Sequence, residues 1–283
     1  MNFKFAVIGG GAWGTAIANL LARLENSSVV IWAQEKEVVG EINSKNKNSL
    51  FLKDIVLEKN IYATEKLSEA IAPFIFYVTP AQNFREIISA HKKYIDKKCE
   101  IVICSKGIEI SSGNLLSDII DSILPNINYY ILSGPSFAHE VANNKPAALV
   151  ISSKNIKNSI KVSNYISSKN FRLYPSDDII GVQLGGAIKN IYAISSGIVS
   201  GLNYGENAVA AILTRAISEM VRISIALGGN KESIFGLSGV GDILLTCTSK
   251  HSRNFTLGVA IGEGDKIEQI IENRKTIAEG YYT

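Results

Sequence analysis

Gly9-Gly10-Gly11-Ala12-Trp13-Gly14 is the stretch of sequence that decides the fold. It directly follows a short apolar strand, Phe3–Ile8, and it opens a helix that continues to about Leu24. The glycines have the GxGxxG spacing of a turn that binds a dinucleotide. A glycine-rich turn without a ligand is the alternative, and the position after the first strand of a βαβ unit favours the dinucleotide.

Each glycine of this turn has its own physical role. Gly9 allows the tight turn, Gly11 lets backbone N–H groups approach a pyrophosphate, and Gly14 lets the helix pack closely on the strand. The N-terminus of the helix then points its partial positive charge toward the phosphates. Ala12 and Trp13 join this predicted cofactor site, Trp13 through its backbone N–H more than through its ring.

Residues 1–176 predict a Rossmann-type, doubly wound α/β domain. Short runs that are apolar at every position and are separated by helices predict a parallel sheet covered on both faces. The expected strands after the first are Val29–Trp32, Ile75–Thr79, Ile101–Cys104, Tyr129–Leu132, Ala147–Ser152 and Phe171–Tyr174. The polar run Asn43–Asn48 predicts a mobile loop.

Residues 177–283 predict an all-α second domain. Asp177–Gly201 and Glu206–Leu227 carry apolar residues at helical spacing, and no clear strand follows them. The first of these segments is apolar enough to raise the question of a membrane span, but Lys189 and several polar residues interrupt it. We therefore expect a buried central helix and no membrane insertion.

Composition excludes several classes of protein. Of the 283 residues, 46% are apolar and 19% are charged, which is typical of a folded globular chain. The formal charge of +3 is small and the lysines are scattered, so a nucleic-acid partner is not expected. The N-terminus lacks the features of a signal peptide, which predicts a cytoplasmic protein. Three cysteines without CxxC spacing argue against a disulfide framework or a metal site.

The residues after the second strand leave the cofactor open between NAD and NADP. A carboxylate at this point binds the ribose 2′-hydroxyl of NAD and repels the 2′-phosphate of NADP. Here the strand ends at neutral Gln34, which joins the predicted cofactor site, and Glu35 and Lys36 follow it. Lys36 favours the phosphate and Glu35 disfavours it.

Several longer motifs follow in a fixed order along the chain. They are Ser105-Lys106-Gly107, Ser133-Gly134-Pro135-Ser136-Phe137-Ala138, Gly185-Gly186-Ala187-Ile188-Lys189-Asn190, Gly239-Val240-Gly241-Asp242, Thr246-Cys247-Thr248 and Ser252-Arg253-Asn254. In this order they resemble the bacterial NAD(P)-dependent glycerol-3-phosphate dehydrogenases, from Phe5 to Gly280. The resemblance implies reduction of dihydroxyacetone phosphate to glycerol 3-phosphate for phospholipid synthesis, and it is compatible with a homodimer.

Lys189 is the predicted general acid and base. Reduction of a ketone by hydride needs a proton donor near the developing alkoxide. Lysine is rarely buried without a partner, and a second cation such as Lys106 would lower its pKa toward a useful range. The resemblance assigns catalysis to Lys189, Lys106 and Asp242, with Thr246 nearby. The alternative is a structural lysine that is paired with Asp242.

Arg253 is the predicted phosphate ligand, because a guanidinium offers a planar and permanently charged fork. The resemblance extends the substrate site to Lys106, Gly134, Ser136, Lys189, Asn190, Asp242, Thr246, Ser252, Arg253 and Asn254. It extends the cofactor site to Lys106, Ala138, Arg253, Ile277 and Glu279. An isolated arginine of this kind would otherwise be interpreted as a solvated surface residue.

Two other classes of function compete with this interpretation. One is a related dehydrogenase that acts on another small substrate; a substrate without phosphate would leave Arg253 buried without its anion. The other is a catalytically impaired protein that still binds NAD(P). Retention of Lys106, Lys189 and Asp242 together argues against the second class.

The chain is short at its C-terminus relative to the family. It ends at Tyr281-Tyr282-Thr283, directly after Glu279, whereas the family continues into further helices. Exposed apolar faces and a frayed end would follow. We expect a protein that binds the dinucleotide but is less stable and less active than a full-length relative, with its last residues mobile.

Overall fold

The structure, a computed structural model, describes residues 3–272 and 279–281. The chain divides into two compact units. The first unit comprises Met1–Ser105, Leu116–Leu132 and Ser136–Asp177. The second comprises Asp178–Thr283 together with Lys106–Leu115 and Ser133–Pro135, two segments that precede residue 177 and still pack with the helical unit.

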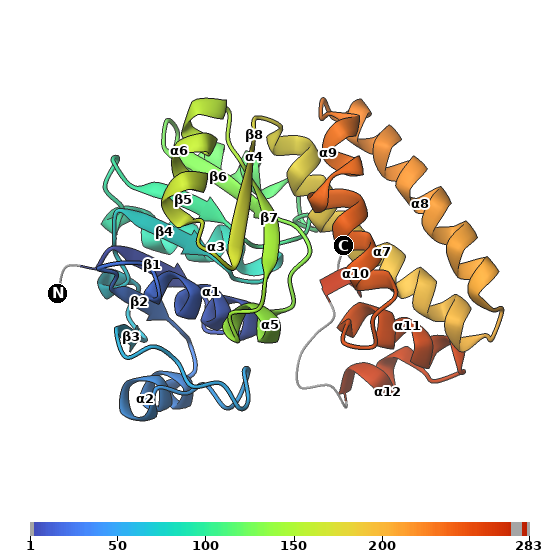
Figure 1. The fold of residues 1–283 in the computed structure, drawn as a ribbon, viewed down its shortest axis with the longest axis horizontal. Coiled ribbons are helices and arrows are strands. Elements are labelled where there is room, and N and C mark those ends of the chain that lie inside the picture. The colour runs from blue at the N-terminus through green and yellow to red at the C-terminus, as the bar shows by residue number, and fades with distance from the viewer. Residues whose placement is uncertain (1–2, 273–278, 282–283) are drawn as a thin grey trace. The chain divides into compact units, whose positions relative to one another are not determined.

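The first unit is built on an eight-stranded sheet (Figure 1). The strands are β1 (Phe5–Ile8), β2 (Val29–Trp32), β3 (Ile61–Thr64), β4 (Phe74–Tyr77), β5 (Glu100–Ile103), β6 (Asn128–Ser133), β7 (Ala147–Ser152) and β8 (Phe171–Ser176). Their order is β3-β2-β1-β4-β5-β6-β7-β8, and the pairs β3–β2, β2–β1, β1–β4, β4–β5, β5–β6 and β7–β8 are parallel. The predicted Rossmann-type sheet is confirmed.

The strand β3 is the one that the sequence pattern did not reveal. Only four residues long, it lies at the edge of the sheet, and its register pairs Ile61 with Val29. Three of its four residues are buried, and the fourth, Tyr62, is 38% exposed. A short edge strand lacks the continuous apolar run by which the central strands are recognised.

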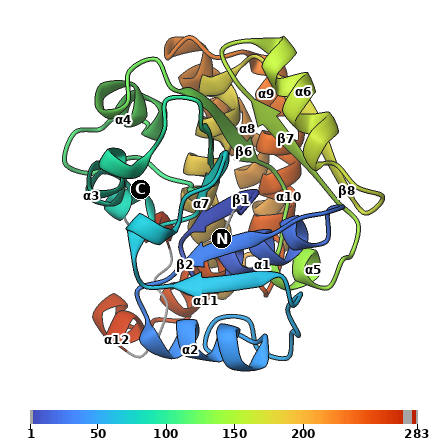
Figure 2. The ribbon, with the colours of Figure 1, turned by 90° about the vertical axis from the view of Figure 1, so that its left-hand side faces the viewer.

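Helices cover both faces of this sheet (Figure 2). On one side lie α1 (Ala12–Ala22), α5 (Ala138–Ala142) and α6 (Ile156–Ile166), and on the other lie α3 (Ala81–His91) and α4 (Leu116–Ile123). The shorter elements are α2 (Lys36–Lys45), η1 (Leu67–Glu69) and η2 (Lys92–Tyr94). Alternate residues of β1 face the two layers: Phe5 and Val7 belong to the core beneath α1, α5 and α6.

The predicted loop at Asn43–Asn48 is wrong for its first half, which is helical. Asn43 to Lys45 form the last turn of α2, and Asn46 ends that helix in the left-handed conformation, with φ 52°. Asn48 is completely buried and its side chain is hydrogen-bonded. A polar run predicts a solvated loop only if its side chains find no partners in the protein, and here the side chains of Asn43, Ser44 and Asn48 are hydrogen-bonded.

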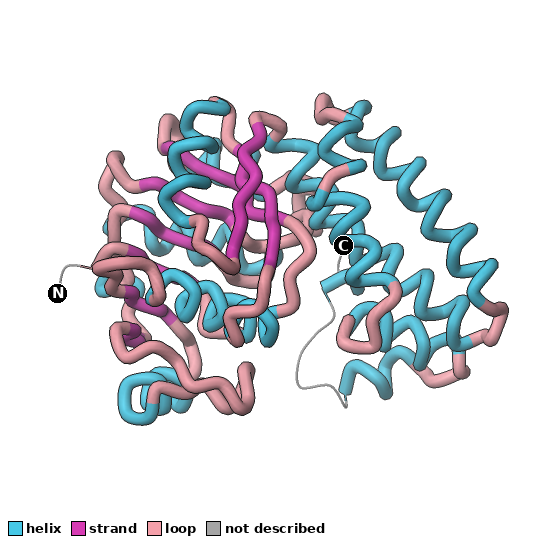
Figure 3. Tube along the Cα trace, in the orientation of Figure 1, coloured by secondary structure: helices cyan, strands magenta, loops and turns pink. Residues whose placement is uncertain are grey.

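The second unit is helical (Figure 3). Its elements are α7 (Ile179–Gly201), α8 (Glu206–Ala226), α9 (Lys231–Phe235), the π-helical turn η3 (Leu237–Gly241), α10 (Asp242–Cys247), α11 (Arg253–Gly262), α12 (Ile267–Glu272) and η4 (Glu279–Tyr281). Asp178 caps the N-terminus of α7, because its side chain accepts a hydrogen bond from the N–H of Gly181 at 2.8 Å. Among the described residues, no helix is both long and apolar enough to cross a bilayer.

Glycines let α7 and α11 touch along their backbones. A Cβ added at Gly197 would come within 2.1 Å of the carbonyl oxygen of Phe255, and one at Gly201 within 2.3 Å of that of Val259. From the other helix, a Cβ at Gly258 would come within 2.0 Å of the carbonyl oxygen of Ile194. This contact fixes the start of α11, where Arg253 lies, relative to the stretch of α7 that carries Lys189.

Candidate active site

The glycine turn is tightly packed at two of its glycines and open at a third. Gly9 has φ +126°, and a Cβ on Gly14 would lie 1.9 Å from the carbonyl oxygen of Gly9, so neither position accepts a side chain. A Cβ on Gly11, in contrast, would meet no atom within 4 Å. The strand and helix are therefore packed tightly around Gly9 and Gly14, and open space remains over Gly11.

The N-terminus of α1 faces this open space. Gly11 is the N-cap residue, and no side chain caps it. The first N–H groups of a helix have no partner within the helix, so Ala12 and Trp13 can offer theirs to an anion. Both side chains are half-buried and pack against the core of the first unit. Gln34 is exposed in the turn between β2 and α2, beside Glu35 and Lys36, which are also exposed.

A buried ionic cluster lies in the second unit. The Nζ of Lys189 donates to Oδ1 of Asp242 at 2.5 Å, and the Nζ of Lys106 donates to Oδ2 of the same carboxylate at 2.6 Å. Asp242 is fully buried, Lys189 is 8% exposed, and the side chain of Lys106 is 15% exposed. Thr246 completes the cluster, because its hydroxyl accepts from Lys189 at 2.9 Å and donates to Asp242 at 3.3 Å.

Two glycines bring α7 close enough to build this cluster. A Cβ on Gly185 would lie 2.4 Å from the carbonyl oxygen of Ser238 in η3, directly before α10. On Gly186 it would lie 2.5 Å from Oγ of Ser133 and 3.4 Å from Cδ of Lys106. Lys189 follows one turn later on α7. The small residues of this motif therefore allow the approach that brings the two lysines onto one carboxylate.

Burial lowers the pKa of Lys189 to about 8. Loss of solvation is the largest cause, the carboxylate of Asp242 opposes it, and the charge of Lys106 adds to it. A structural lysine would also pair with a buried carboxylate, but it would not need a second ammonium group on the same acid. The cluster thus keeps one lysine close to the pH at which it can both give and accept a proton.

In the loop after β6, one predicted site residue, Gly134, contacts the ionic cluster. Gly134 has φ +144°, and its carbonyl oxygen accepts a hydrogen bond from the Nζ of Lys106 at 3.2 Å. Ser136 and Ala138 follow in the first unit and are half-buried, with Ala138 at the start of α5.

At the start of α11, Ser252 and Asn254 have structural partners. The hydroxyl of Ser252 accepts from the N–H of Phe255 at 3.2 Å and so caps the helix. Asn254 donates to Oδ1 of Asn190 at 3.0 Å and accepts from the N–H of Gly280 at 3.0 Å. Asn254 therefore ties η4 to α7 next to Lys189.

Arg253, the first residue of α11, is exposed. The expectation that a substrate without phosphate would leave this cation buried is therefore wrong, since water solvates the guanidinium whether or not an anion is bound. Arg253 is nevertheless well placed for a phosphate, because the N-terminal end of the helix that it begins also favours an anion.

The predicted cofactor contacts near the C-terminus are only partly visible. Ile277 lies outside the described residues, as do residues 282 and 283, so the expectation for the last residues is not addressed. Glu279 begins η4, the backbone turn that is held through Gly280.

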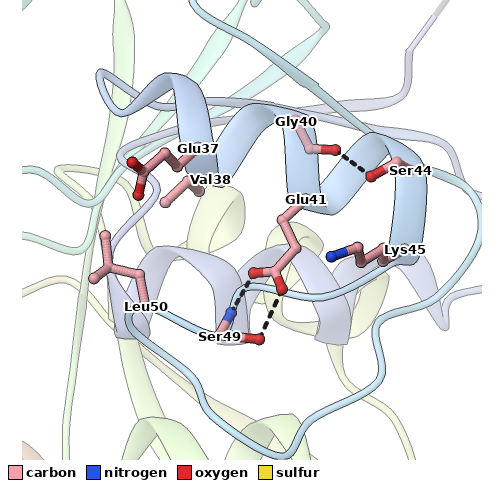
Figure 4. Close-up of a pocket in the computed structure, with 8 residues that line it drawn as sticks. All are labelled: Glu37, Val38, Gly40, Glu41, Ser44, Lys45, Ser49 and Leu50. Carbon is pink, nitrogen blue, oxygen red and sulfur yellow. Dashed lines mark hydrogen bonds between the residues drawn. The ribbon is translucent and has the colours of Figure 1, made fainter.

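A separate hollow of about 650 Å³ lies in the first unit (Figure 4). It is formed by α2 and the loop that follows, and its lining residues are Glu37, Val38, Gly40, Glu41, Ser44, Lys45, Ser49 and Leu50. None of the predicted site residues lines it.

Two residues near the glycine turn escaped the sequence analysis. Gly10 packs closely on Ala33, because a Cβ at Gly10 would lie 2.4 Å from the Cβ of Ala33. Asn48 donates hydrogen bonds to Gly10 and Thr15. The run of three glycines could have singled out Gly10, which lies in its middle. Nothing in the local sequence distinguishes Asn48 from its polar neighbours.

The fold and the site together define a class of protein. A Rossmann-type sheet with a glycine turn is combined with a helical unit that contains a buried Lys–Asp–Lys cluster and an exposed arginine at a helix start. This combination is that of an NAD(P)-dependent dehydrogenase with a Rossmann-type nucleotide domain.

Comparison with known proteins identifies the family. Residues 4–159 match the N-terminal family of NAD-dependent glycerol-3-phosphate dehydrogenase, and residues 178–283 match its C-terminal family. The chain belongs to the NAD-dependent glycerol-3-phosphate dehydrogenases and is an NAD(P)-dependent oxidoreductase.

Individual relatives agree over nearly the whole chain. Glycerol-3-phosphate dehydrogenase [NAD(P)+] of Erythrobacter litoralis is 43% identical over 100% of this chain and 85% of its own length. The same enzyme of Novosphingobium aromaticivorans is 41% identical, also over 100% of this chain and 85% of its own length. The crystal structure of glycerol-3-phosphate dehydrogenase from Coxiella burnetii has a TM-score of 0.94 at 36% identity and covers 99% of this chain and 86% of its own.

Proposed function

We propose that this protein reduces dihydroxyacetone phosphate to sn-glycerol 3-phosphate with NADH or NADPH. The observation that carries the proposal is the placement of Lys106 and Lys189 on the two oxygens of Asp242. Segments far apart in the sequence build this cluster in a chain of this family. The cofactor, when bound, supplies a hydride to the carbonyl carbon of the substrate.

In this proposal the cluster supplies the proton and the positive field. As the hydride arrives, negative charge develops on the carbonyl oxygen, and protonated Lys189 donates its proton to that oxygen. Lys106 stabilises the developing charge electrostatically. Asp242 and Thr246 orient the ammonium group of Lys189 through the hydrogen bonds that they already make. In the reverse direction, neutral Lys189 accepts the proton of the hydroxyl group.

The remaining residues of the proposed site bind and orient. The glycine turn with Ala12 and Trp13 binds the pyrophosphate, and Gln34 lies toward the adenosine. Arg253 binds the substrate phosphate as the partner of a charge-assisted hydrogen bond. Asn190, Gly134, Ser136, Ser252 and Asn254 complete the substrate site, and Ala138, Ile277 and Glu279 complete the cofactor site.

The cellular setting is also part of the proposal. The product is a phosphorylated glycerol, the backbone from which glycerophospholipids are made, and we place the reaction at the start of that synthesis. A cytoplasmic location fits this role, and a homodimer is compatible with the resemblance to the family.

A test of the activity uses the purified protein with NADH and with NADPH. Dihydroxyacetone phosphate should support cofactor oxidation, followed by the fall in absorbance at the nicotinamide band, whereas unphosphorylated dihydroxyacetone should react at least ~10-fold more slowly in kcat/KM. Equal rates for both ketones would remove the phosphate from the proposal. Cofactor binding without any oxidation would leave the two alternatives, a dehydrogenase that acts on another small substrate and a catalytically impaired protein.

The rates of reduction and oxidation should depend on pH in opposite ways near the pKa of Lys189, which is about 8. Reduction needs the protonated lysine, so its rate falls as pH rises through this value; oxidation needs the neutral lysine, so its rate rises. Because the Asp242 carboxylate raises the pKa of Lys189, Asp242→Asn should move both limbs to lower pH. Profiles of kcat/KM in both directions measure this, and limbs that stay in place in the variant would exclude Lys189 as the titrating group.

A further inference from the structure

Asn48 holds the glycine turn from a distance of 38 residues along the chain. Its side chain is 0% exposed, and its Nδ2 donates to the carbonyl oxygen of Gly10 at 2.8 Å and to Oγ1 of Thr15 at 2.7 Å. The hydroxyl of Thr15 in turn donates to the same Gly10 oxygen at 3.2 Å. The carbonyl of Gly10 thus accepts two hydrogen bonds, both from buried side chains.

Fixing this carbonyl also fixes the next N–H group. In a planar trans peptide, the C=O of one residue and the N–H of the following residue point in opposite directions. The oxygen of Gly10 is held toward Asn48 and Thr15, so the N–H of Gly11 points the other way. Gly11 is the residue over which the structure leaves open space and at which the uncapped helix α1 begins.

The loop that carries Asn48 is itself held in place. The backbone N–H of Leu52 donates to the carbonyl of Asn48 at 2.8 Å, and that of Phe51 donates to its side-chain oxygen at 3.3 Å. On the outer side, the carboxylate of Glu41 accepts from the N–H of Ser49 at 2.6 Å and from its hydroxyl at 2.8 Å (Figure 4). These bonds lower the pKa of Glu41. Hydrogen bonds therefore hold the loop residues next to Asn48, and the loop presents Asn48 to the glycine turn in a fixed position.

We propose that Asn48 is a positioning residue for the dinucleotide, which aims the N–H of Gly11 at the pyrophosphate by holding the carbonyl of Gly10. The inference rests on the proposed binding of NAD(P) by the glycine turn. Without Asn48, the carbonyl keeps only its weaker bond from Thr15, and the peptide between Gly10 and Gly11 can turn. Cofactor binding is then weaker, because part of the binding free energy is used to order the N–H of Gly11.

Asn19 offers a matched control in the same unit. It is also 0% exposed, and its side chain also joins two backbone groups, donating to the carbonyl of Ala142 at 3.2 Å and accepting from the N–H of Glu58 at 2.8 Å. Neither partner belongs to the glycine turn. Asn48→Ala and Asn19→Ala thus remove the same side chain from equally buried positions, and only one of them releases Gly10.

The experiment measures NADH binding by fluorescence titration, steady-state kinetics and thermal unfolding for the wild type and both variants. In Asn48→Ala, Kd and KM for NADH should rise about tenfold, the scale of one lost buried hydrogen bond, with kcat at saturating NADH and KM for dihydroxyacetone phosphate changed by less than about threefold. Asn19→Ala should lower the melting temperature to a similar extent and leave Kd for NADH within about twofold. Equal weakening of NADH binding in the two variants would overturn the proposal.

A second variant keeps the test decisive if Asn48→Ala does not fold. Thr15→Val removes the hydroxyl that donates to the Gly10 carbonyl and accepts from Asn48. The carbonyl loses one of its two hydrogen bonds and the Asn48 amide loses one of its acceptors, so Kd for NADH should rise roughly threefold with kcat retained. Unchanged NADH binding in Thr15→Val, with Asn48→Ala unfolded, would also overturn the proposal. A wild-type protein that binds no NADH would instead overturn the proposed function, so the two failures are distinguishable.

Discussion

Lys189→Met lowers kcat for reduction of dihydroxyacetone phosphate by at least ~100-fold, the scale of a lost general acid, and leaves NADH binding nearly unchanged. Methionine fills a similar volume in the buried helix α7 but carries no proton. The carboxylate of Asp242 remains neutralised by Lys106, which donates to it at 2.6 Å, so the buried acid is not left without a cation. The loss therefore appears in kcat, and fluorescence titration with NADH checks that the nucleotide site is intact.

Lys231→Met is the control for this variant, because it removes a lysine from the same helical unit at an exposed position. Its Nζ lies 3.9 Å from a carboxylate oxygen of Glu232, and its side chain is 62% exposed. An exposed pair of this kind contributes little, so kcat should stay within about twofold of the wild type. Turnover retained in Lys189→Met would remove this lysine from the mechanism.

Arg253→Ala should weaken the binding of the phosphorylated substrate by roughly 1.5–3 kcal/mol, the scale of charge-assisted hydrogen bonds. This corresponds to an increase in KM of about 10-fold to 150-fold. Because Arg253 is exposed and lies at the start of α11, its removal leaves no buried charge behind, and the fold should tolerate it. KM for dihydroxyacetone phosphate in steady-state kinetics is the measurement.

A matched arginine separates phosphate recognition from general attraction by positive charge. Arg222, on α8, is also exposed, and Arg222→Ala should leave KM unchanged within about twofold. The slow reaction with unphosphorylated dihydroxyacetone should also be unaffected by Arg253→Ala. If KM rises equally in the two variants, Arg253 has no specific role in binding the phosphate.

The sequence predicted the parts of the fold that local patterns encode. The strand Val29–Trp32 is apolar and buried throughout, the strand Ala147–Ser152 is mostly apolar and partly buried, and the predicted bounds of both agree with the structure. The long helices α7 and α8 followed from their apolar spacing. The edge strand β3 did not, because the exposed Tyr62 interrupts its apolar character. Local composition also misjudged Asn48, whose partners lie in the glycine turn.

The site shows the same limit at the level of single residues. Motif order was enough to single out Lys106, Lys189 and Asp242, and the structure brings all three together. Motif order could not show that the hydroxyl of Ser252 caps α11 or that Arg253 is exposed. Both depend on where the helix begins and on what packs around it, and spacing along the chain does not contain that information.

The helical unit is not continuous along the chain, and this limits how it can be exchanged between proteins. A cut after Asp177 would carry Lys189, Asp242 and Thr246 with the C-terminal piece but leave Lys106 and Gly134 behind, because Lys106–Leu115 and Ser133–Pro135 come from the first half of the sequence. A hybrid joined at that point inherits its two lysines from different parents. An exchange of the helical unit between two proteins therefore has to include these two earlier segments, because the C-terminal piece alone does not carry the whole cluster.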